Sequence, residues 1–184
     1  MNYFDEPQEI LRVDENDSVL GSVDKLLAHK EGLLHRGFTL VLFHNDRVVL
    51  QHRKHMVFDD CFDTTISSHQ LSIDDKPQND LDAIAKTLER ETSLTIDSCR
   101  AEPKHVGTFM YKASQKDGQF TEHEVLRVYV AKIDAVPVMN ETFAYGLSLK
   151  TVEEIKQSRA EFKNMLAPWS QEMIKRDLLQ QPPL

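Results

Sequence analysis

The sequence predicts one α/β sandwich, and three observations lead to that prediction. Short apolar runs of strand length occupy residues 9–51, a helical stripe follows at residues 80–93, and a second strand pair at residues 106–133 precedes a helical C-terminal part. Strands followed by a helix, more strands and terminal helices are typical of a single α/β (α+β) sandwich. With 184 residues, the chain is long enough for one domain, residues 1–184, with a sizeable core.

The first half of the chain predicts strands and one loop. A strand is expected at residues 9–14, and an acidic turn follows it. Residues 38–43 and 47–51 flank a polar turn, and apolar residues occupy both of their alternating sets of positions, so we expect a hairpin that is covered on both faces. Residues 66–76 are polar and irregular, which predicts a loop over a site.

The second half predicts a helix, a hairpin and further helices. Asn79 is suited to cap a helix over residues 80–93, because its side-chain oxygen can accept from free N–H groups of the first turn. Residues 106–112 are expected to pair with residues 120–133, turning at residues 116–118.

Residues 150–184 are expected to be helical. Thr151 and Glu154 have the spacing of a capping box, and Pro168 suits the first turn of a final helix that runs through Leu179.

Two glutamates continue the apolar face of the strand at residues 120–130. Every second side chain of a strand points to the same side, and the inner side is marked by Phe120, Leu126, Val128 and Val130. Glu122 and Glu124 share this parity, so two carboxylates point inward. Buried unpaired charges of one sign are costly, so we expect a bound cation, with His35 and His69 as co-ligands. The alternative is a frayed strand end with both glutamates in water.

Composition excludes some functions. The formal net charge of −8 argues against a general binder of nucleic acid or of anionic membranes. Cys61 and Cys99 are the two cysteines, and they do not suggest a disulfide framework. The N-terminus has no basic or apolar segment typical of a signal peptide, and no run approaches a membrane span. We therefore expect a cytoplasmic protein, whose oligomeric state stays open.

Short motifs lie in a characteristic order along residues 9–178. They are Gly32-Leu-Leu-His35-Arg-Gly-Phe-Thr-Leu-Val-Leu-Phe43, Leu50-Gln-His-Arg53, Ser67-Ser-His69-Gln-Leu71, Glu91, Phe109-Met-Tyr111-Lys-Ala113, Glu122-His-Glu124 and Ala167-Pro168-Trp169. This order resembles the type I isopentenyl-diphosphate isomerases of the Nudix-fold superfamily. The resemblance implies a Nudix-like α/β/α sandwich with a mixed sheet. It also implies an isomerase of isoprenoid biosynthesis, which interconverts isopentenyl and dimethylallyl diphosphate.

The resemblance implies a divalent metal site. Its ligands would be His35, His69, Glu122 and Glu124, with His29 as the fifth ligand. Imidazoles and carboxylates together suit Mn²⁺ or Zn²⁺. For His29, a solvated loop histidine is the alternative.

A second metal ion is implied at the substrate. Glu91 matches the glutamate that holds Mg²⁺ on the substrate diphosphate. Its parity with Ile84 and Leu88 places it on the inward stripe of the predicted helix. The alternative is a solvated position, because residues 89–91 are consecutive charges.

The resemblance also assigns residues to the substrate, a small diphosphate. Arg53 matches an arginine that reaches the diphosphate, and Lys54 is the candidate for a lysine in the same segment. Trp169 matches an indole that lies against the cationic intermediate, which a π face can stabilise. Tyr111 matches a phenol near the catalytic carboxylate of Glu124. Surface or core roles are the alternatives for Arg53, Trp169 and Tyr111.

Ser67 is the main departure from the family pattern, because it stands where the family has its catalytic cysteine. The isomerisation needs one group that adds a proton and one that removes a proton. A thiol has a reference pKa near 8.5, whereas an unactivated hydroxyl is a far weaker acid. We therefore expect reduced activity.

Two further departures concern the diphosphate. Thr87 stands where many relatives have arginine, and Asp59-Asp60 replaces a Pro-Gly pair before the catalytic loop. Fewer cations and two added carboxylates predict weak binding of the diphosphate unless Mg²⁺ is supplied.

Three functions stay open. The chain is an isomerase with altered or reduced activity, a catalytically impaired metal-binding protein of Nudix fold, or a Nudix-type diphosphate hydrolase. A hydrolase of this type holds its metals with several glutamates on one helix. Residues 86–93 keep only the last glutamate of that pattern and lack its glycine, so hydrolysis is the weaker enzymatic interpretation.

Overall fold

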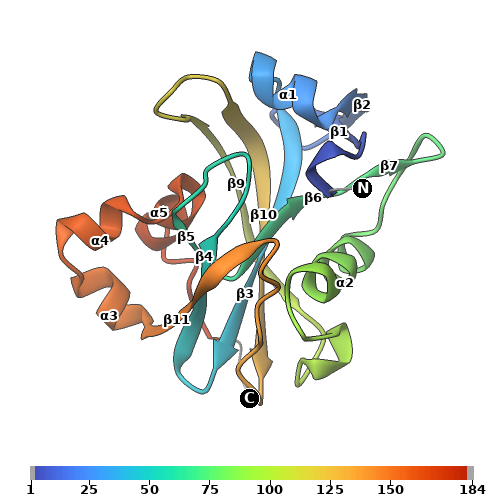
Figure 1. The fold of residues 1–184 in the computed structure, drawn as a ribbon. Coiled ribbons are helices and arrows are strands. Elements are labelled where there is room, and N and C mark those ends of the chain that lie inside the picture. Colours follow the sequence, from blue (N-terminus) through green and yellow to red (C-terminus); the bar gives the residue numbers. More distant parts are fainter. Residues whose placement is uncertain (1–2, 182–184) are drawn as a thin grey trace.

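The predicted hairpin forms the middle of a mixed sheet in the computed structural model, which describes residues 3–181 (Figure 1). Strand β3 (His35–His44) pairs in parallel with β10 (Thr121–Ile133) along one edge. Its other edge is shared by three antiparallel partners, β1 (Glu9–Val13), β6 (Ile66–His69) and β4 (Arg47–Arg53). β3 is therefore the strand on which the other central elements are aligned.

Four further strands complete this sheet among the described residues. β2 pairs with β1, β5 and β11 pair with β4, and β9 pairs with β10. A separate two-stranded ribbon joins β7 and β8. The bounds are β2 (Val19–Asp24), β5 (Phe62–Asp63), β7 (Ser72–Ile73), β8 (Lys76–Pro77), β9 (Lys104–Ser114) and β11 (Ala144–Thr151).

Helices cover the sheet on two sides. Figure 1 shows α2 on one side and three short C-terminal helices on the other, with α1 at the end where β1 and β2 lie. Two 3₁₀ turns lie at Tyr3–Asp5 and Ile96–Ser98. The bounds are α1 (Lys25–Glu31), α2 (Asp80–Glu91), α3 (Val152–Gln157), α4 (Ala160–Asn164) and α5 (Pro168–Lys175).

The two faces of β3 contribute to two separate cores. Val41 and Phe43 pack with residues of the C-terminal helices, including Ile155 and Met173. Phe38, Leu40 and Leu42 pack with α2 through Ile84 and Leu88. Both alternating sets of β3 side chains are buried in this way, which confirms the prediction of a hairpin covered on both faces.

Several predicted local features are confirmed. The Asn79 side chain accepts from Leu81 N and Asp82 N at the start of α2. The capping box of Thr151 and Glu154 is formed at α3. The strand at residues 9–14 and the hairpin of β9 and β10 are also present.

Two predictions about secondary structure were wrong. Residues 66–76 are not an irregular loop throughout, because residues 66–69 form the strand β6 and the ribbon of β7 and β8 follows. The free edge of β3 offers hydrogen bonds even to a polar segment. The C-terminal part is not continuously helical, and its final helix ends at Lys175 rather than Leu179. Asp177 adopts a left-handed conformation with φ 55°, which stops the helix.

Candidate active site and metal centre

The register of three strands brings the central residues of the site together. Glu124 on β10 lies opposite His35 on β3 and opposite Tyr111 on β9. Glu122 lies two residues earlier on the same side of β10. Both carboxylates are buried, with 6% of Glu122 and 5% of Glu124 exposed. The inward orientation predicted from their parity is therefore confirmed.

Three histidines surround these carboxylates. His35 begins β3, His69 ends β6 and His29 lies in α1. Nε2 of His29 is 3.1 Å from Glu122 Oε2, and Nε2 of His69 is 3.0 Å from Glu124 Oε1. The ring of each histidine lies about 5 Å from the rings of the other two.

Backbone carbonyl groups fix the orientation of two of these rings. Nδ1 of His29 lies 2.5 Å from the carbonyl oxygen of Lys25, and Nδ1 of His35 lies 2.7 Å from that of Leu33. A carbonyl oxygen only accepts, so each Nδ1 carries a hydrogen, and in the neutral ring each Nε2 keeps a lone pair that faces the carboxylates. Ligand histidines in proteins are held in this way.

The donor set fits a divalent cation. One atom each from His29, His35, His69 and Glu122 lie within 4.8 Å of one another. Ligands that share a cation at about 2.0–2.2 Å are about 3–3.6 Å apart, close to the separations found here. Buried polar atoms without a hydrogen-bond partner include His35 Nε2, both ring nitrogens of His69 and Glu122 Oε2. A cation would satisfy these atoms, and three imidazoles favour Zn²⁺ or Mn²⁺ over Mg²⁺.

The two glutamates differ in their electrostatic environment. Burial and then the charge of Glu122 raise the pKa of Glu124 well above its ordinary value. Burial also disfavours ionised Glu122, but His29 and the other histidines outweigh it and hold the pKa of Glu122 well below the ordinary range. Between the two carboxyl groups, Glu124 is the one that retains a proton.

Two neighbours define the position of the Glu124 carboxyl group. The Tyr111 hydroxyl donates to Glu124 Oε2. On the β3 side, a Cβ atom at Gly37 would lie only 2.1 Å from Glu124 Oε1. Glycine at position 37 therefore leaves the space that this carboxyl group occupies.

A cavity of about 420 Å³ lies beside this cluster. Its lining contains catalytic and metal candidates from the sequence, namely Ser67, Tyr111, Glu122, Glu124, His29, His69, Glu91, Arg53 and Trp169. The structure thus brings most of the predicted site residues to one place. The volume is in the ordinary range for a small-molecule site.

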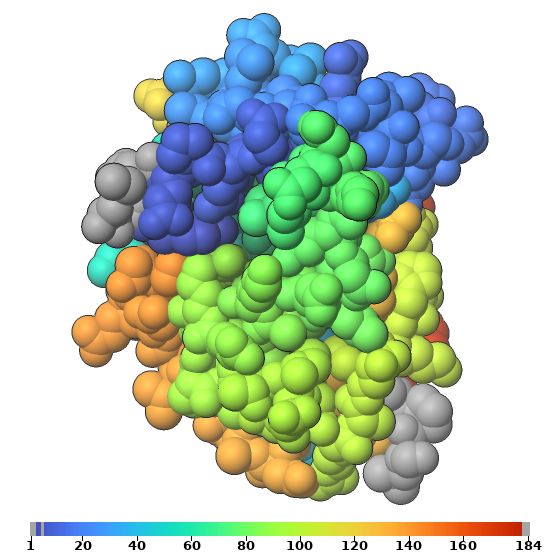
Figure 2. Space-filling view, turned by 90° about the vertical axis from the view of Figure 1, so that its right-hand side faces the viewer, coloured from blue at the N-terminus to red at the C-terminus, as the bar shows by residue number. Residues whose placement is uncertain are grey.

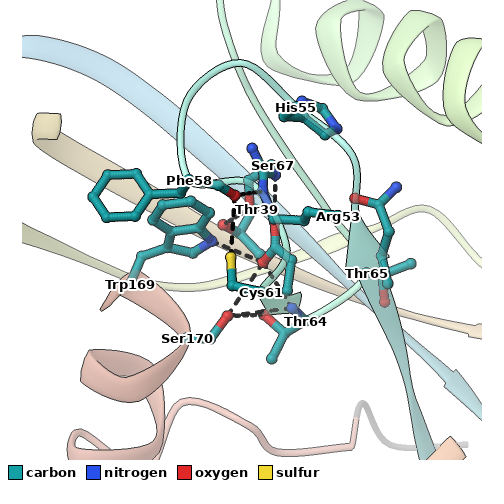
Figure 3. Close-up of polar contacts among 12 residues, drawn as sticks. Thr39, Arg53, His55, Phe58, Cys61, Thr64, Thr65, Ser67, Trp169 and Ser170 are labelled. Atoms are coloured by element: carbon teal, nitrogen blue, oxygen red, sulfur yellow. Dashed lines mark hydrogen bonds and ion pairs between the residues drawn. The ribbon is translucent and has the colours of Figure 1, made fainter. Parts of the chain in front are cut away.

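Trp169 is held at the cavity by a buried carboxylate. Asp63 accepts from Trp169 Nε1 at 2.7 Å, from Ser170 Oγ at 3.2 Å and from Arg53 Nη1 at 3.1 Å. Figure 3 shows Trp169, Ser170 and Arg53 gathered around this point from α5 and from the end of β4. The Arg53 guanidinium carbon also lies 5.0 Å from the centre of the Trp169 ring.

Ser67 points into the cavity from β6. Its hydroxyl group is 2.7 Å from the Thr39 hydroxyl group on β3 (Figure 3). No base lies among its hydrogen-bond partners in the described residues. The nearest thiol in sequence, Cys61, has its pKa raised to about 12, chiefly by burial, and donates to the Phe58 carbonyl oxygen.

Glu91 belongs to a second polar cluster rather than to the histidine cluster. It is fully buried at the end of α2. Gln51 Nε2 donates to its Oε2 at 3.1 Å, and Arg90 Nη2 donates to its Oε1 at 2.8 Å. His55 Nε2 lies 3.8 Å from Oε2, so one basic side chain and one imidazole adjoin this carboxylate.

Other predicted residues lie away from the cavity. Lys54 is exposed and donates to the Glu141 carbonyl oxygen at 3.0 Å. Asp59 accepts from the Tyr145 hydroxyl at 3.2 Å, and Asp60 lies 2.8 Å from His52 Nε2. None of these three side chains lines the cavity. The two aspartates therefore do not add charge to the lining as expected, because each is bound to a partner outside it.

Sequence reasoning missed several residues of the site. Lys25 and Arg90 line the cavity as cations, and Asp63 and Gly37 position Arg53 and Glu124. The signal for Lys25 was its spacing of one helical turn from His29. Asp63 has no signal in the sequence, because its importance comes from partners about a hundred residues later.

No family model matches the chain. The chain is 30% identical over 177 residues to an isopentenyl-diphosphate Delta-isomerase of Haloarcula marismortui, covering 92% of this chain and 91% of that one. Isopentenyl-diphosphate Delta-isomerase 1 of Mesocricetus auratus is 28% identical, with 85% and 76% covered, and that of Photorhabdus laumondii is 28% identical, with 88% and 90% covered.

Solved structures share the fold. The DR0079 protein of Deinococcus radiodurans has a TM-score of 0.69 at 18% identity, covering 93% of this chain and 98% of that one. A MutT NUDIX hydrolase of Burkholderia pseudomallei has a TM-score of 0.54 at 14% identity, covering 77% and 96%. The predicted Nudix-like fold is thus confirmed. No helix of residues 3–181 is long and apolar enough to cross a membrane.

Proposed function

The chain belongs to the isopentenyl-diphosphate Delta-isomerase family, and on that premise we propose that it interconverts isopentenyl and dimethylallyl diphosphate. The observation that carries the proposal is the cavity where Glu124, Tyr111, Ser67 and Trp169 meet beside the histidine cluster. These side chains supply a proton carrier, a hydrogen-bond donor, a second hydroxyl group and an aromatic face in one place.

The reaction adds a proton to the terminal alkene carbon, which gives a tertiary cation. It then removes a proton from the methylene group next to the cationic carbon, on the opposite face. Glu124 is suited to hold one of these protons, because burial and the charge of Glu122 raise its pKa well above its ordinary value. Tyr111 donates to Glu124 Oε2 and orients the other oxygen. The Trp169 face can stabilise the cation in a pocket that excludes water.

The histidine cluster supports the acid–base group. We propose that His29, His35, His69, Glu122 and Glu124 hold a divalent cation, which supplies positive charge to the two buried carboxylates when bound. Glu91 is proposed to hold Mg²⁺ that arrives with the diphosphate. Arg53 and Lys54 were expected at the diphosphate, and of these two only Arg53 lines the cavity.

Ser67 is proposed to occupy the second proton-transfer position and to limit the rate. Its hydroxyl group bonds to Thr39, and a hydroxyl without a base is a poor proton donor. A positioned acid–base group typically contributes about 10²–10⁴-fold. Ser67→Cys is therefore expected to raise turnover at least about tenfold, and Glu124→Gln is expected to abolish the gain.

The test follows isopentenyl diphosphate with Mg²⁺ or Mn²⁺ and measures both dimethylallyl diphosphate and released phosphate. Formation of the isomer supports the proposal. Phosphate release without isomer would indicate a hydrolase. A hydrolase of this type needs several glutamates of one helix at its metals, whereas here Glu89 is exposed and Glu91 is the buried carboxylate at this end of α2. No turnover by either the wild type or Ser67→Cys, with metal binding intact, would favour a metal-binding protein that has lost catalysis.

A further inference from the structure

Arg53 and Arg90 both line the cavity, but they differ in how many of their donors the protein already uses. Each of the three guanidinium nitrogens of Arg53 donates within the chain. Nε donates to the Phe58 carbonyl oxygen, Nη2 to that of Val57, and Nη1 to Asp63. With 5% of the residue exposed, Arg53 is bound into the loop that it supports.

Arg90 keeps most of its donors free. Its Nη2 donates to Glu91 Oε1 at 2.8 Å and to Thr87 Oγ1 at 3.3 Å. Among the described residues no acceptor is recorded for Nη1, and Nε is buried without a hydrogen-bond partner. Nε is shielded from solvent, so Nη1, which has no acceptor within the described residues, is the donor left for a ligand.

Aromatic rings pack on one side of the Arg90 guanidinium group. Its central carbon is 4.2 Å from the centre of the Tyr3 ring and 5.5 Å from that of Phe143. In Figure 2 the N-terminal segment lies against α2 and against the segment near residue 140. Contact with these rings holds the group in place, while 22% of the side chain stays exposed. A guanidinium group held in this way, with a free donor, is suited to bind a phosphate oxygen.

The position of Arg90 also bears on the arginine missing at position 87. Arg90 follows Thr87 by three residues on α2, and its guanidinium group turns back to reach the Thr87 hydroxyl group. The positive charge therefore lies beside residue 87, at the cavity.

We propose that Arg90 binds the diphosphate of the substrate through Nη1, and that Arg53 mainly supports the cavity wall. The inference rests on the proposed function for the identity of the substrate. The chemistry that it requires is an anionic phosphate group, so inorganic pyrophosphate is a sufficient probe.

The test is calorimetric titration of the wild-type chain and Arg90→Gln with pyrophosphate and with isopentenyl diphosphate, in buffer without Mg²⁺. A hydrogen bond to a charged group contributes about 1.5–3 kcal/mol, so affinity for both ligands is expected to fall about 10- to 150-fold. Arg100→Gln is the matched control, because Arg100 is half-exposed and pairs with Asp134 away from the cavity. It is expected to leave affinity unchanged.

A double variant separates direct contact from repulsion. Arg90→Gln leaves Glu91 without its partner, and this carboxylate would then repel the anion. The double variant Arg90→Gln, Glu91→Gln removes that repulsion. If the double variant still binds pyrophosphate far more weakly than Glu91→Gln alone, Arg90 contacts the ligand directly. Equal affinity of the double variant and Glu91→Gln would overturn the proposal, as would a wild-type chain that binds pyrophosphate neither with nor without Mg²⁺.

Turnover is measured separately. If the wild type does not isomerise the substrate, but Arg90→Gln binds pyrophosphate more weakly than the wild type, the isomerase function is refuted. The role of Arg90 in binding phosphate is then still supported. A chain that isomerises while Arg90→Gln keeps full affinity would refute the role of Arg90 alone.

Discussion

Asp63 and Glu122 are two buried carboxylates near one cavity, and they differ in how many hydrogen bonds the chain provides to them. Asp63 is fully buried and accepts from Trp169, Ser170, Arg53 and the backbone of Thr64. Glu122 is almost as buried, but its Oε2 has no hydrogen-bond partner, and neither do Nε2 of His35 and the ring nitrogens of His69.

This difference distinguishes a carboxylate that supports the fold from one that is suited to bind a cation. A buried carboxylate whose partners all come from the chain stabilises a particular packing, here that of α5 against β5. A buried carboxylate among unpartnered imidazoles is incomplete without a further positive charge. Burial alone does not distinguish the two cases, whereas the count of satisfied atoms does.

The largest loss of stability is expected when Asp63, the carboxylate whose partners all come from the chain, is replaced. Asp63→Asn leaves the buried Arg53 guanidinium group without its counter-ion, which typically costs about 3–5 kcal/mol. Urea unfolding followed by circular dichroism measures the loss. Asp134→Asn is the control, because the exposed pair with Arg100 contributes at most about 1 kcal/mol. Equal losses in the two variants would contradict the distinction drawn here.

Metal ions should affect only the unsatisfied cluster. At a concentration of Zn²⁺ or Mn²⁺ about 100 times the Kd, binding adds about 2.7 kcal/mol of stability, or about 5–10 °C in Tm. Glu122→Gln is expected to remove this rise, while Asp63→Asn keeps it from a lower starting Tm. Chelation with EDTA reverses it. A rise of the same size in Glu122→Gln would place the cation elsewhere.

The pH dependence tests a third kind of buried group. The side chain of His55 is 10% exposed, and its Nε2 has no hydrogen-bond partner. Burial, followed by the charges of Arg53, Lys25 and Arg90, lowers its pKa well below 6.5. The unfolded chain then binds the proton first, so this contribution to stability is full above pH 6.5 and is lost as the pH falls below it.

The loss from His55 is at most about 1.4 kcal/mol per pH unit. His55→Gln is therefore expected to flatten the decline in unfolding free energy between pH 6.5 and 5, measured in urea. An unchanged slope would mean that other groups cause the decline.

The smallest effect is expected when one of several donors is removed. Ser170→Ala takes one hydrogen bond from Asp63, which keeps Trp169 and Arg53, so the loss should be about 1 kcal/mol. Differential scanning calorimetry resolves this. A loss as large as that of Asp63→Asn would show that Ser170, rather than the arginine, compensates the charge.

The sequence was sufficient to predict features that depend on a local pattern of residues. Glu122 and Glu124 could be assigned to the inner side because strand parity is fixed and the flanking residues are apolar. Asn79 and Thr151 could be assigned as caps because capping depends on a few adjacent residues. His35 and His69 were proposed as co-ligands from their residue type, and the family resemblance supported that choice, since parity does not reveal which strands are neighbours.

The rest depends on side-chain direction and distant partners. Lys54 and Arg53 are adjacent in sequence, but successive residues at the end of a strand point to opposite sides, so only Arg53 reaches the cavity. Arg90 lies on the helix next to Glu91, and its long side chain turns back toward Thr87. Residues 66–69 are polar and were expected as a loop, because the free edge of β3 that they complete is not visible locally.

His35 and Glu124 are neighbours across a parallel ladder, although about 90 residues separate them along the chain. Closing so long a loop costs entropy before any contact repays it, and parallel pairing of this kind forms slowly. We therefore expect the histidines and glutamates to come together late in folding, once β10 has docked on β3. A cation that needs the assembled cluster binds after this step, so it prolongs the lifetime of the folded chain without accelerating its formation.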